Sequence, residues 1–246
     1  MLMSVVSQLL NDHFPAKAAM RLRAVKNRRD LFGLYAPAEL LTGLVPNGSI
    51  AVDAGAAHGL YAYFIAKRAS VVHAFEPNPH MFARLDAGAG RKIVTHAVAL
   101  SDRTGLATLH VPPAGFGEAS LHQHPERGDE LMTVEVETRT LDSFRLHGVG
   151  LLKADVEGHE MSLLRGGETT LRACMPTLFL ELEERHTPGI LGETRAFLKG
   201  LGYRSEHYLQ HGRMRPMNEF DLERDQLAKS DEPSSPDYAC NFLFRR

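Results

Sequence analysis

The chain has few cysteines and lacks long apolar runs. Cys174 and Cys240 are its only cysteines, too few for a disulfide framework or a thiolate metal site, and we interpret both as small buried apolar side chains in a reducing compartment. No apolar run approaches the roughly 20 residues of a membrane-spanning helix, and residues 1–10 lack the basic start and apolar core of a secretion signal. We therefore expect a cytoplasmic protein without stable membrane insertion.

The chain also lacks an excess of charge of either sign. Its 28 Lys and Arg residues and 30 Asp and Glu residues give a net charge of −2, so no overall field attracts nucleic acid, and we expect no nucleic-acid partner. With 43% hydrophobic residues among 246, the chain is large enough to bury the core of one domain. No motif specifies an oligomeric state.

Histidine is abundant, with 13 residues, and is a common metal ligand. The nearest pairs are His122 with His124 and His207 with His211, and neither lies beside a compact set of carboxylates that would complete a catalytic zinc site. We therefore predict no metal site. His186, just beyond a predicted strand, is interpreted as a residue of a substrate pocket.

A glycine-containing loop after a short apolar run is the most informative segment. Residues 50–52 form the apolar run, Asp53 follows it, and Gly55 and Gly59 lie in the loop. Glycine lets the backbone turn tightly and approach a ligand closely. A helix is expected to begin near His58 and to continue for about three turns, because apolar residues recur there at helical spacing.

A second acidic residue, Glu76, follows the next predicted strand at residues 71–75. It lies 23 residues after Asp53, about where doubly wound folds place the carboxylate that binds the ribose hydroxyls of a nucleotide. The spacing therefore predicts a cofactor that contains adenosine.

The glycine loop itself indicates which cofactor this is. It has neither the G-x-G-x-x-G pattern of a dinucleotide fold nor the G-K-[ST] of a P-loop, and Asp53 precedes it. A negative charge there disfavours a pyrophosphate and favours a cationic ligand, which S-adenosylmethionine is. Methyl transfer is the leading hypothesis, while an NAD-dependent oxidoreductase or a non-catalytic binding module on the same fold are the alternatives.

Several sequence blocks resemble the FkbM-type methyltransferase family. They are VDAGAAHG at 52–59, AFEPNP at 74–79, VALSDRTG at 98–105, KADVEGHE at 153–160 with LRGG at 164–167, and the strand at 176–181. The resemblance covers about residues 49–203. One position departs from the pattern: Ala57 stands where the family usually has Asn.

This resemblance implies an S-adenosylmethionine-dependent methyltransferase acting on a hydroxyl of a small molecule, a sugar or a natural product. It also implies roles for the residues of the first three blocks. Asp53, Gly55 and Gly59 would hold the methionine end, Glu76 the ribose hydroxyls and Asn78 the ribose or the adenine edge, and Ala97 and Val98 would pack near the adenine.

The densest group of titratable residues follows the predicted strand at residues 150–154. Asp155, Glu157 and His159 are the candidates for accepting the proton of the acceptor hydroxyl, because strand ends of a doubly wound sheet converge on one edge. The alternative interpretation is that Glu157 and Glu160 lie in the first turn of a helix and stabilise its positive end, and that Lys153 only pairs with a carboxylate on its own face.

The expected fold is α/β, a doubly wound and mostly parallel sheet of seven strands with the methyltransferase strand order. We expect a helical extension over residues 1–47, with a basic cluster at its solvated end, and a methyltransferase domain over residues 48–246. A hairpin-like insertion is expected at 104–140, with strands at 106–111 and 132–139 and a candidate lid at 112–130. Final strands are predicted at 203–209 and 238–244, joined by a mobile connection at 219–237.

Overall fold

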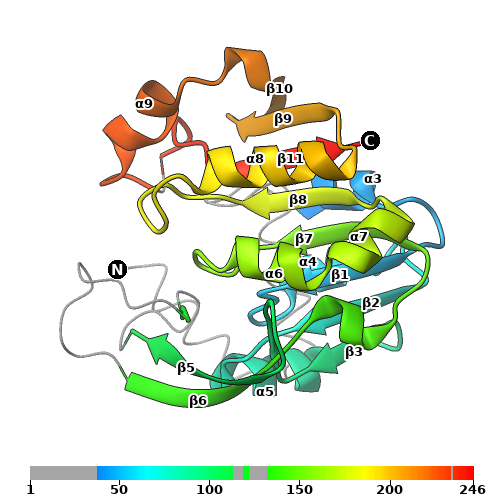
Figure 1. Cartoon of the computed structure of the whole chain (residues 1–246). Helices are drawn as coiled ribbons and strands as arrows, with labels where there is room; N and C mark the ends of the chain where they lie inside the picture. The colour runs from blue at the N-terminus through cyan, green and yellow to red at the C-terminus, as the bar shows by residue number, and fades with distance from the viewer. Residues whose placement is uncertain (1–37, 113–118, 122–131, 234) are drawn as a thin grey trace.

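An eight-stranded sheet dominates the computed structural model, which describes residues 38–112, 119–121, 132–233 and 235–246 (Figure 1). The strand order is β3-β2-β1-β7-β8-β11-β9-β10. Neighbours among the first five strands are parallel, whereas β11 is antiparallel to β8 and β9. The strands are β1 (Ile50–Ala54), β2 (Val71–Phe75), β3 (Ile93–His96), β7 (Val149–Ala154), β8 (Thr177–Glu181), β9 (Ser205–Gln210), β10 (Arg213–Pro216) and β11 (Asn241–Arg245).

The predicted strand order is confirmed, but the predicted number of seven strands is wrong by one. The additional strand, β10, pairs with β9 in an antiparallel hairpin at the edge of the sheet. His211 and Gly212 form the two-residue turn, with φ of 51° and 69°. Two consecutive positive φ angles are characteristic of the type I′ turn that joins tight hairpins.

Apolar side chains cover both faces of the sheet. Along β1, Val52 and Ala54 belong to one core and Ala51 to the other, because successive residues of a strand point to opposite faces. Helices α6, α7 and α8 contribute to the first core and lie in front of the sheet in Figure 1, and α3, α4 and α5 contribute to the second. The helices are α3 (Ala38–Leu44), α4 (Leu60–Ile65), α5 (Pro79–Gly88), α6 (Glu160–Gly166), α7 (Glu168–Cys174), α8 (Ile190–Leu201) and α9 (Leu222–Asp225), with 3₁₀ turns η2 (Leu141–Phe144), η3 (Met217–Glu219) and η4 (Leu227–Lys229).

Helix α4 is shorter than the three turns predicted. It begins after Gly59, which has φ 87°, and regular helix ends at Ile65. The backbone then tightens, since the amide of Lys67 donates to Phe64 and that of Arg68 to Ile65, three residues back in each case. The apolar residues spaced along this segment are buried, but the spacing does not give the length of the helix, since Ala69 is fully buried after the helix has ended.

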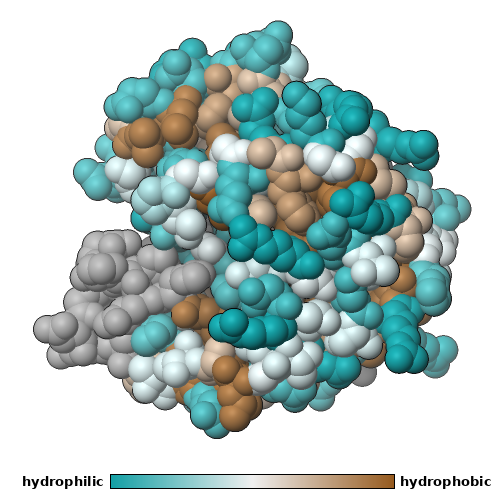
Figure 2. Space-filling view, in the orientation of Figure 1, coloured by the Kyte–Doolittle hydropathy of each residue, from teal (hydrophilic) through white to brown (hydrophobic). Residues whose placement is uncertain are grey.

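The inserted strands form a separate small sheet. As predicted, β5 (Gly105–Val111) and β6 (Met132–Arg139) are antiparallel, and β4 (Ala99–Leu100) pairs with β6. Most of the candidate lid and the predicted N-terminal helix with its basic cluster lie outside the described residues. Figure 2 shows apolar patches near β5 and β6 on a mostly hydrophilic face. Leu106 in β5 and Met132 in β6 are exposed. Scattered exposed apolar residues of this kind are common and indicate no function by themselves.

The connection expected to be mobile is held to the sheet by a buried side chain. Gln226 is 1% exposed, and its Nε2 donates to the carbonyls of Leu182 and Ala239 at 2.9 Å. Its Oε1 accepts from the amide of Glu184 at 2.8 Å. Three hydrogen bonds to backbone groups around β8 and β11 thus anchor this segment, which contains α9 and η4 and is not irregular throughout. Among the described residues, no helix is long and apolar enough to cross a membrane.

Candidate active site

The glycine loop crosses the end of β7 in direct contact. Gly55 has φ 68°, and a Cβ at this position would lie 1.7 Å from the backbone oxygen of Asp155. The amide of Asp155 donates to the carbonyl of Ala54 at 3.2 Å. Only glycine fits both the backbone conformation and the space, so the loop after β1 and the loop after β7 share one fixed crossing point. Gly59, also in the left-handed region, ends the loop at the start of α4.

Glu76 joins the end of β2 to this loop. Its side chain accepts hydrogen bonds from the amide of Asn78 at Oε1 and from the amide of Ala57 at Oε2, both at 2.8 Å. Burial raises the pKa of Glu76 to about 7, although these two amides act in the opposite direction. Each carboxylate oxygen has a second lone pair, so Glu76 can still accept hydrogen bonds from the hydroxyls of a ribose.

Asp53 is fully buried in β1, and neither carboxylate oxygen has a hydrogen-bond partner of normal geometry among the described residues. Its ion pair with Lys153 spans 3.5 Å, from Oδ1 to Nζ. Burial raises the pKa of Asp53 to about 6. A buried carboxylate without hydrogen bonds is costly, and a cation bound nearby would stabilise it. The residues present therefore fit S-adenosylmethionine, whose methionine end carries positive charge.

Lys153, which had been expected only to pair with a carboxylate, contacts both strand ends. Its Nζ lies 3.3 Å from Oδ2 of Asp155, which confirms the predicted pairing, and it donates to the carbonyl of Gly55 at 3.0 Å. Asp53 and Lys153 are register partners on β1 and β7, so their side chains leave the sheet on the same face. The contact with Asp53 was missed because it depends on this pairing register.

Asp155 interacts with Glu181, which ends β8. The Asp155 side chain is 33% exposed, and Lys153 holds its pKa below the usual range despite burial. Burial and the adjacent Asp155 raise the pKa of Glu181 well above its usual range. The pKa values of the two carboxyl groups therefore shift in opposite directions, and the two groups titrate as a pair.

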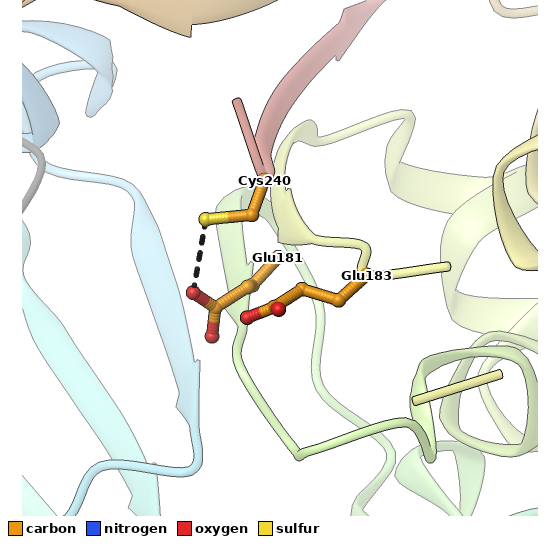
Figure 3. Close-up of side chains that lie close together, drawn as sticks. All are labelled: Glu181, Glu183 and Cys240. Carbon is orange, nitrogen blue, oxygen red and sulfur yellow. Dashed lines mark hydrogen bonds between the residues drawn. The ribbon is translucent and has the colours of Figure 1, made fainter. Parts of the chain in front are cut away.

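Glu181 also belongs to a polar cluster with Cys240 and Glu183 (Figure 3). Cys240 Sγ donates to Glu181 Oε1 at 3.3 Å, and Glu183 Oε2 accepts from the hydroxyl of Tyr238 at 2.6 Å and pairs with Arg185. Burial raises the pKa of the Cys240 thiol well above its usual value, and the nearby Glu181 and Glu183 act in the same direction. Our interpretation of both cysteines as small buried apolar residues is wrong, because both are only partly buried and the sulfur of Cys240 lies in this network.

The other two predicted catalytic residues contact different partners. His159 precedes α6, and its Nε2 lies 2.9 Å from the hydroxyl of Ser101. Glu157 Oε2 lies 3.6 Å from Nδ1 of His186, which places His186 beside the acidic loop. The hydroxyl of Ser120, from the inserted segment, donates to the carbonyl of Glu157 at 2.7 Å. The structure thus brings Asp155, Glu157 and His159 into one loop, but each side chain has its own partner.

Of the two glutamates expected in the first helical turn, only one is there. Glu160 begins α6, and its Oε1 accepts from the amides of Val156 and Gly158 at 3.0 and 3.3 Å. Glu157 lies before the helix with φ 52°, a conformation that excludes it from a helical turn. The expected position in the first helical turn is therefore confirmed for Glu160 and wrong for Glu157.

The residues expected around the ribose and adenine follow β2 and β3. Asn78 caps α5, since its Oδ1 accepts from the amide of His80 at 3.0 Å. Ala97 is exposed and Val98 is buried, directly after β3. Contacts of these three residues with a cofactor remain predictions. We had not predicted the stacking of Phe75 on His96, with ring centroids 4.4 Å apart, since it follows from the register of β2 and β3.

This fold and this pair of buried carboxylates around a glycine loop define an S-adenosylmethionine-dependent methyltransferase. Residues 53–205 match the family model described as the methyltransferase FkbM domain, which is more than half of the chain. The chain belongs to the FkbM methyltransferase family. This membership leaves the NAD-dependent oxidoreductase alternative without support.

Two methyltransferases are similar to this chain in sequence. The 31-O-demethyl-FK506 methyltransferase FkbM of Streptomyces tacrolimicus is 31% identical over 192 residues, 63% of this chain and 73% of the relative. The hexuronic acid methyltransferase AglP of Haloferax volcanii is 26% identical over 148 residues, 59% of this chain and 61% of the relative.

A solved structure, the methyltransferase FkbM from Methylobacillus flagellatus KT, is similar in fold. It aligns with a TM-score of 0.54 at 16% identity, over 96% of this chain and 57% of that chain. The chain therefore spans little more than half the length of this structure.

Proposed function

We propose that this protein transfers the methyl group of S-adenosylmethionine to a hydroxyl group of a sugar or a small natural product. The observation that carries the proposal is the crossing of the glycine loop and the Asp155 loop, which brings a site for a cationic donor beside an ionised, partly exposed carboxylate. The names of the two relatives support the acceptor class, since one acts on FK506 lacking a methyl group and the other on a hexuronic acid.

The donor is held by the ends of β1, β2 and β3. Asp53 stabilises the positive charge of the methionine end, and Gly55 and Gly59 let the backbone approach it. Glu76 accepts hydrogen bonds from the ribose hydroxyls with the lone pairs that Ala57 and Asn78 leave free. The remaining contacts, with the ribose or adenine, come from Asn78, Ala97 and Val98.

The acceptor hydroxyl is held at the end of β7. S-adenosylmethionine, when bound, would supply a methyl group on a sulfonium, whose sulfur leaves as the neutral thioether of S-adenosylhomocysteine when the carbon–sulfur bond breaks. Asp155 accepts a hydrogen bond from the hydroxyl and then its proton, which becomes acidic as the oxygen forms its bond to carbon, so a weak base suffices. Holding the reacting groups in line provides much of the rate. Glu157 pairs with His186 and His159 contacts the hydroxyl of Ser101, and these contacts hold the loop that carries Asp155 in place.

Methyl transfer from labelled S-adenosylmethionine tests this function. The purified protein is incubated with neutral sugars, uronic acids and hydroxylated natural products, with RNA and duplex DNA as additional acceptors. We expect label in at least one hydroxylated small molecule and none in nucleic acid, and we expect Asp155→Asn to lower the rate without abolishing cofactor binding. Cofactor binding without transfer to any acceptor would favour the non-catalytic module instead.

A further inference from the structure

The side chain of Lys153 is buried in β7 between the two halves of the site. The residue is 2% exposed, and Nζ approaches oxygen atoms from both β1 and β7. These oxygens are Oδ1 of Asp53 at 3.5 Å, Oδ2 of Asp155 at 3.3 Å, and the carbonyls of Gly55 at 3.0 Å and Ala54 at 3.4 Å. Three of the four belong to the segment assigned to the donor, and the fourth to the carboxylate assigned to the acceptor.

The ammonium group remains charged in this position. Burial alone would lower the pKa of a lysine, but Asp155 and Asp53 raise it above its usual value, and Glu181 acts in the same direction. The ring of Tyr61, from α4, lies 5.1 Å from Nζ and adds a favourable contact with the cation. A charged donor of hydrogen bonds therefore lies where two carboxylates would otherwise repel each other.

We infer that Lys153 is a positioning residue for methyl transfer, which holds the donor loop and the Asp155 carboxylate in one fixed relation. The inference rests on the proposed function. Gly55 and Asp155 fix the two backbones where they cross, and Lys153 fixes the carboxylates that extend from them. Its loss releases the carbonyls of the glycine loop, leaves Asp53 without its ion pair, and leaves Asp155 without the cation that keeps it ionised.

The test compares Lys153→Met with the matched control Lys92→Met. Lys92 also donates to a backbone carbonyl, that of Ala69 at 2.9 Å, but it is an exposed residue next to β3 and away from these carboxylates. The measurements are the affinity for S-adenosylhomocysteine, which needs no acceptor, and the dependence of kcat on pH. The affinity for S-adenosylhomocysteine reports on the cofactor site even if no acceptor has been found. Failure of this inference is therefore distinguishable from failure of the proposed function.

We expect Lys153→Met to weaken S-adenosylhomocysteine binding at least tenfold and to move the acidic limb of the kcat profile to higher pH by about one unit or more. The limb moves upward because Asp155 takes up a proton more readily without the cation. A merely structural role would lower the folded fraction without moving this limb. Wild-type affinity together with an unshifted limb would overturn the inference.

A second variant covers the case that Lys153→Met does not fold. Lys153→Met combined with Asp53→Asn removes both charges of the ion pair, so that no uncompensated charge is left at residue 53. Asp155 still loses its cation in this double variant, and the same upward movement of the acidic limb is expected relative to Asp53→Asn alone. An unchanged limb in this comparison would contradict the inference.

Discussion

Gly55 lies against the backbone carbonyl of Asp155 so closely that a methyl group on residue 55 would be 1.7 Å from the oxygen. We expect Gly55→Ala to lower the free energy of unfolding by about 2–4 kcal/mol, because it adds both a clash and an unfavourable φ of 68°. Urea denaturation measures this loss. Gly192→Ala in α8 is the control, since nothing lies within 4 Å of its Cβ position, and it should stabilise the protein slightly. Equal effects of the two substitutions on the free energy of unfolding would contradict the close contact between Gly55 and the backbone of Asp155.

Ala57 has φ 47°, in the left-handed region that alanine rarely adopts. Ala57→Gly, and to a lesser extent Ala57→Asn, should raise the free energy of unfolding by up to about 1 kcal/mol, because glycine and asparagine tolerate this conformation better. Thermal unfolding of the three proteins measures the order Gly, Asn, Ala. A loss of stability in the Asn variant would show that the side chain at residue 57 clashes with its surroundings.

Glu160 is fully buried, and burial raises its pKa to about 7. Because the folded state raises the pKa of Glu160, folding favours the protonated side chain. The contribution of Glu160 to the free energy of unfolding is therefore fully present below its pKa in the unfolded chain, and it is lost as pH rises through about 7. Glu160→Gln keeps an oxygen for the amides of Val156 and Gly158 but carries no proton to lose. We expect the variant to gain about 1–3 kcal/mol over wild type between pH 5 and pH 8, measured by chemical denaturation. A difference that does not change with pH would exclude this account.

Cofactor binding should depend on pH in the opposite sense. Asp53 and Glu76 have pKa values raised to about 6 and about 7, and a cationic ligand favours their charged forms. We expect the affinity for S-adenosylmethionine to rise from pH 5.5 to pH 8, with release of protons on binding at the lower pH. Calorimetry in buffers of different ionisation enthalpy measures the protons released. Uptake of protons, or an affinity independent of pH, would contradict the assigned roles.

The sequence predicted the parts of the site that are local in the chain. Asp53, the glycines and Glu76 each follow a short apolar run, and the strands β1, β2, β7 and β8 formed as predicted. Contacts that depend on strand register were not predictable from spacing, and the approach of Lys153 to Asp53 is the main example. Backbone conformation was equally hidden, since a positive φ removed Glu157 from the helix that its position in the sequence had predicted.

The edge of the sheet was predicted less well for similar reasons. The turn at His211 and Gly212 is too short to stand out among other polar residues, so β10 was missed. The composition of residues 219–237 is charged and rich in serine and proline, and it obscured the buried Gln226 that holds this segment.

The most direct test of the account is titration calorimetry with S-adenosylhomocysteine of wild type, Glu76→Gln and the control Glu168→Gln, whose carboxylate pairs with Arg172 at the surface. We expect micromolar binding to wild type and the control. Binding to Glu76→Gln should fall at least tenfold, because its NH₂ group faces an amide donor of Ala57 or Asn78 and one acceptor for the ribose is lost. Unchanged binding by Glu76→Gln, or tight binding of NAD in place of S-adenosylhomocysteine, would contradict it.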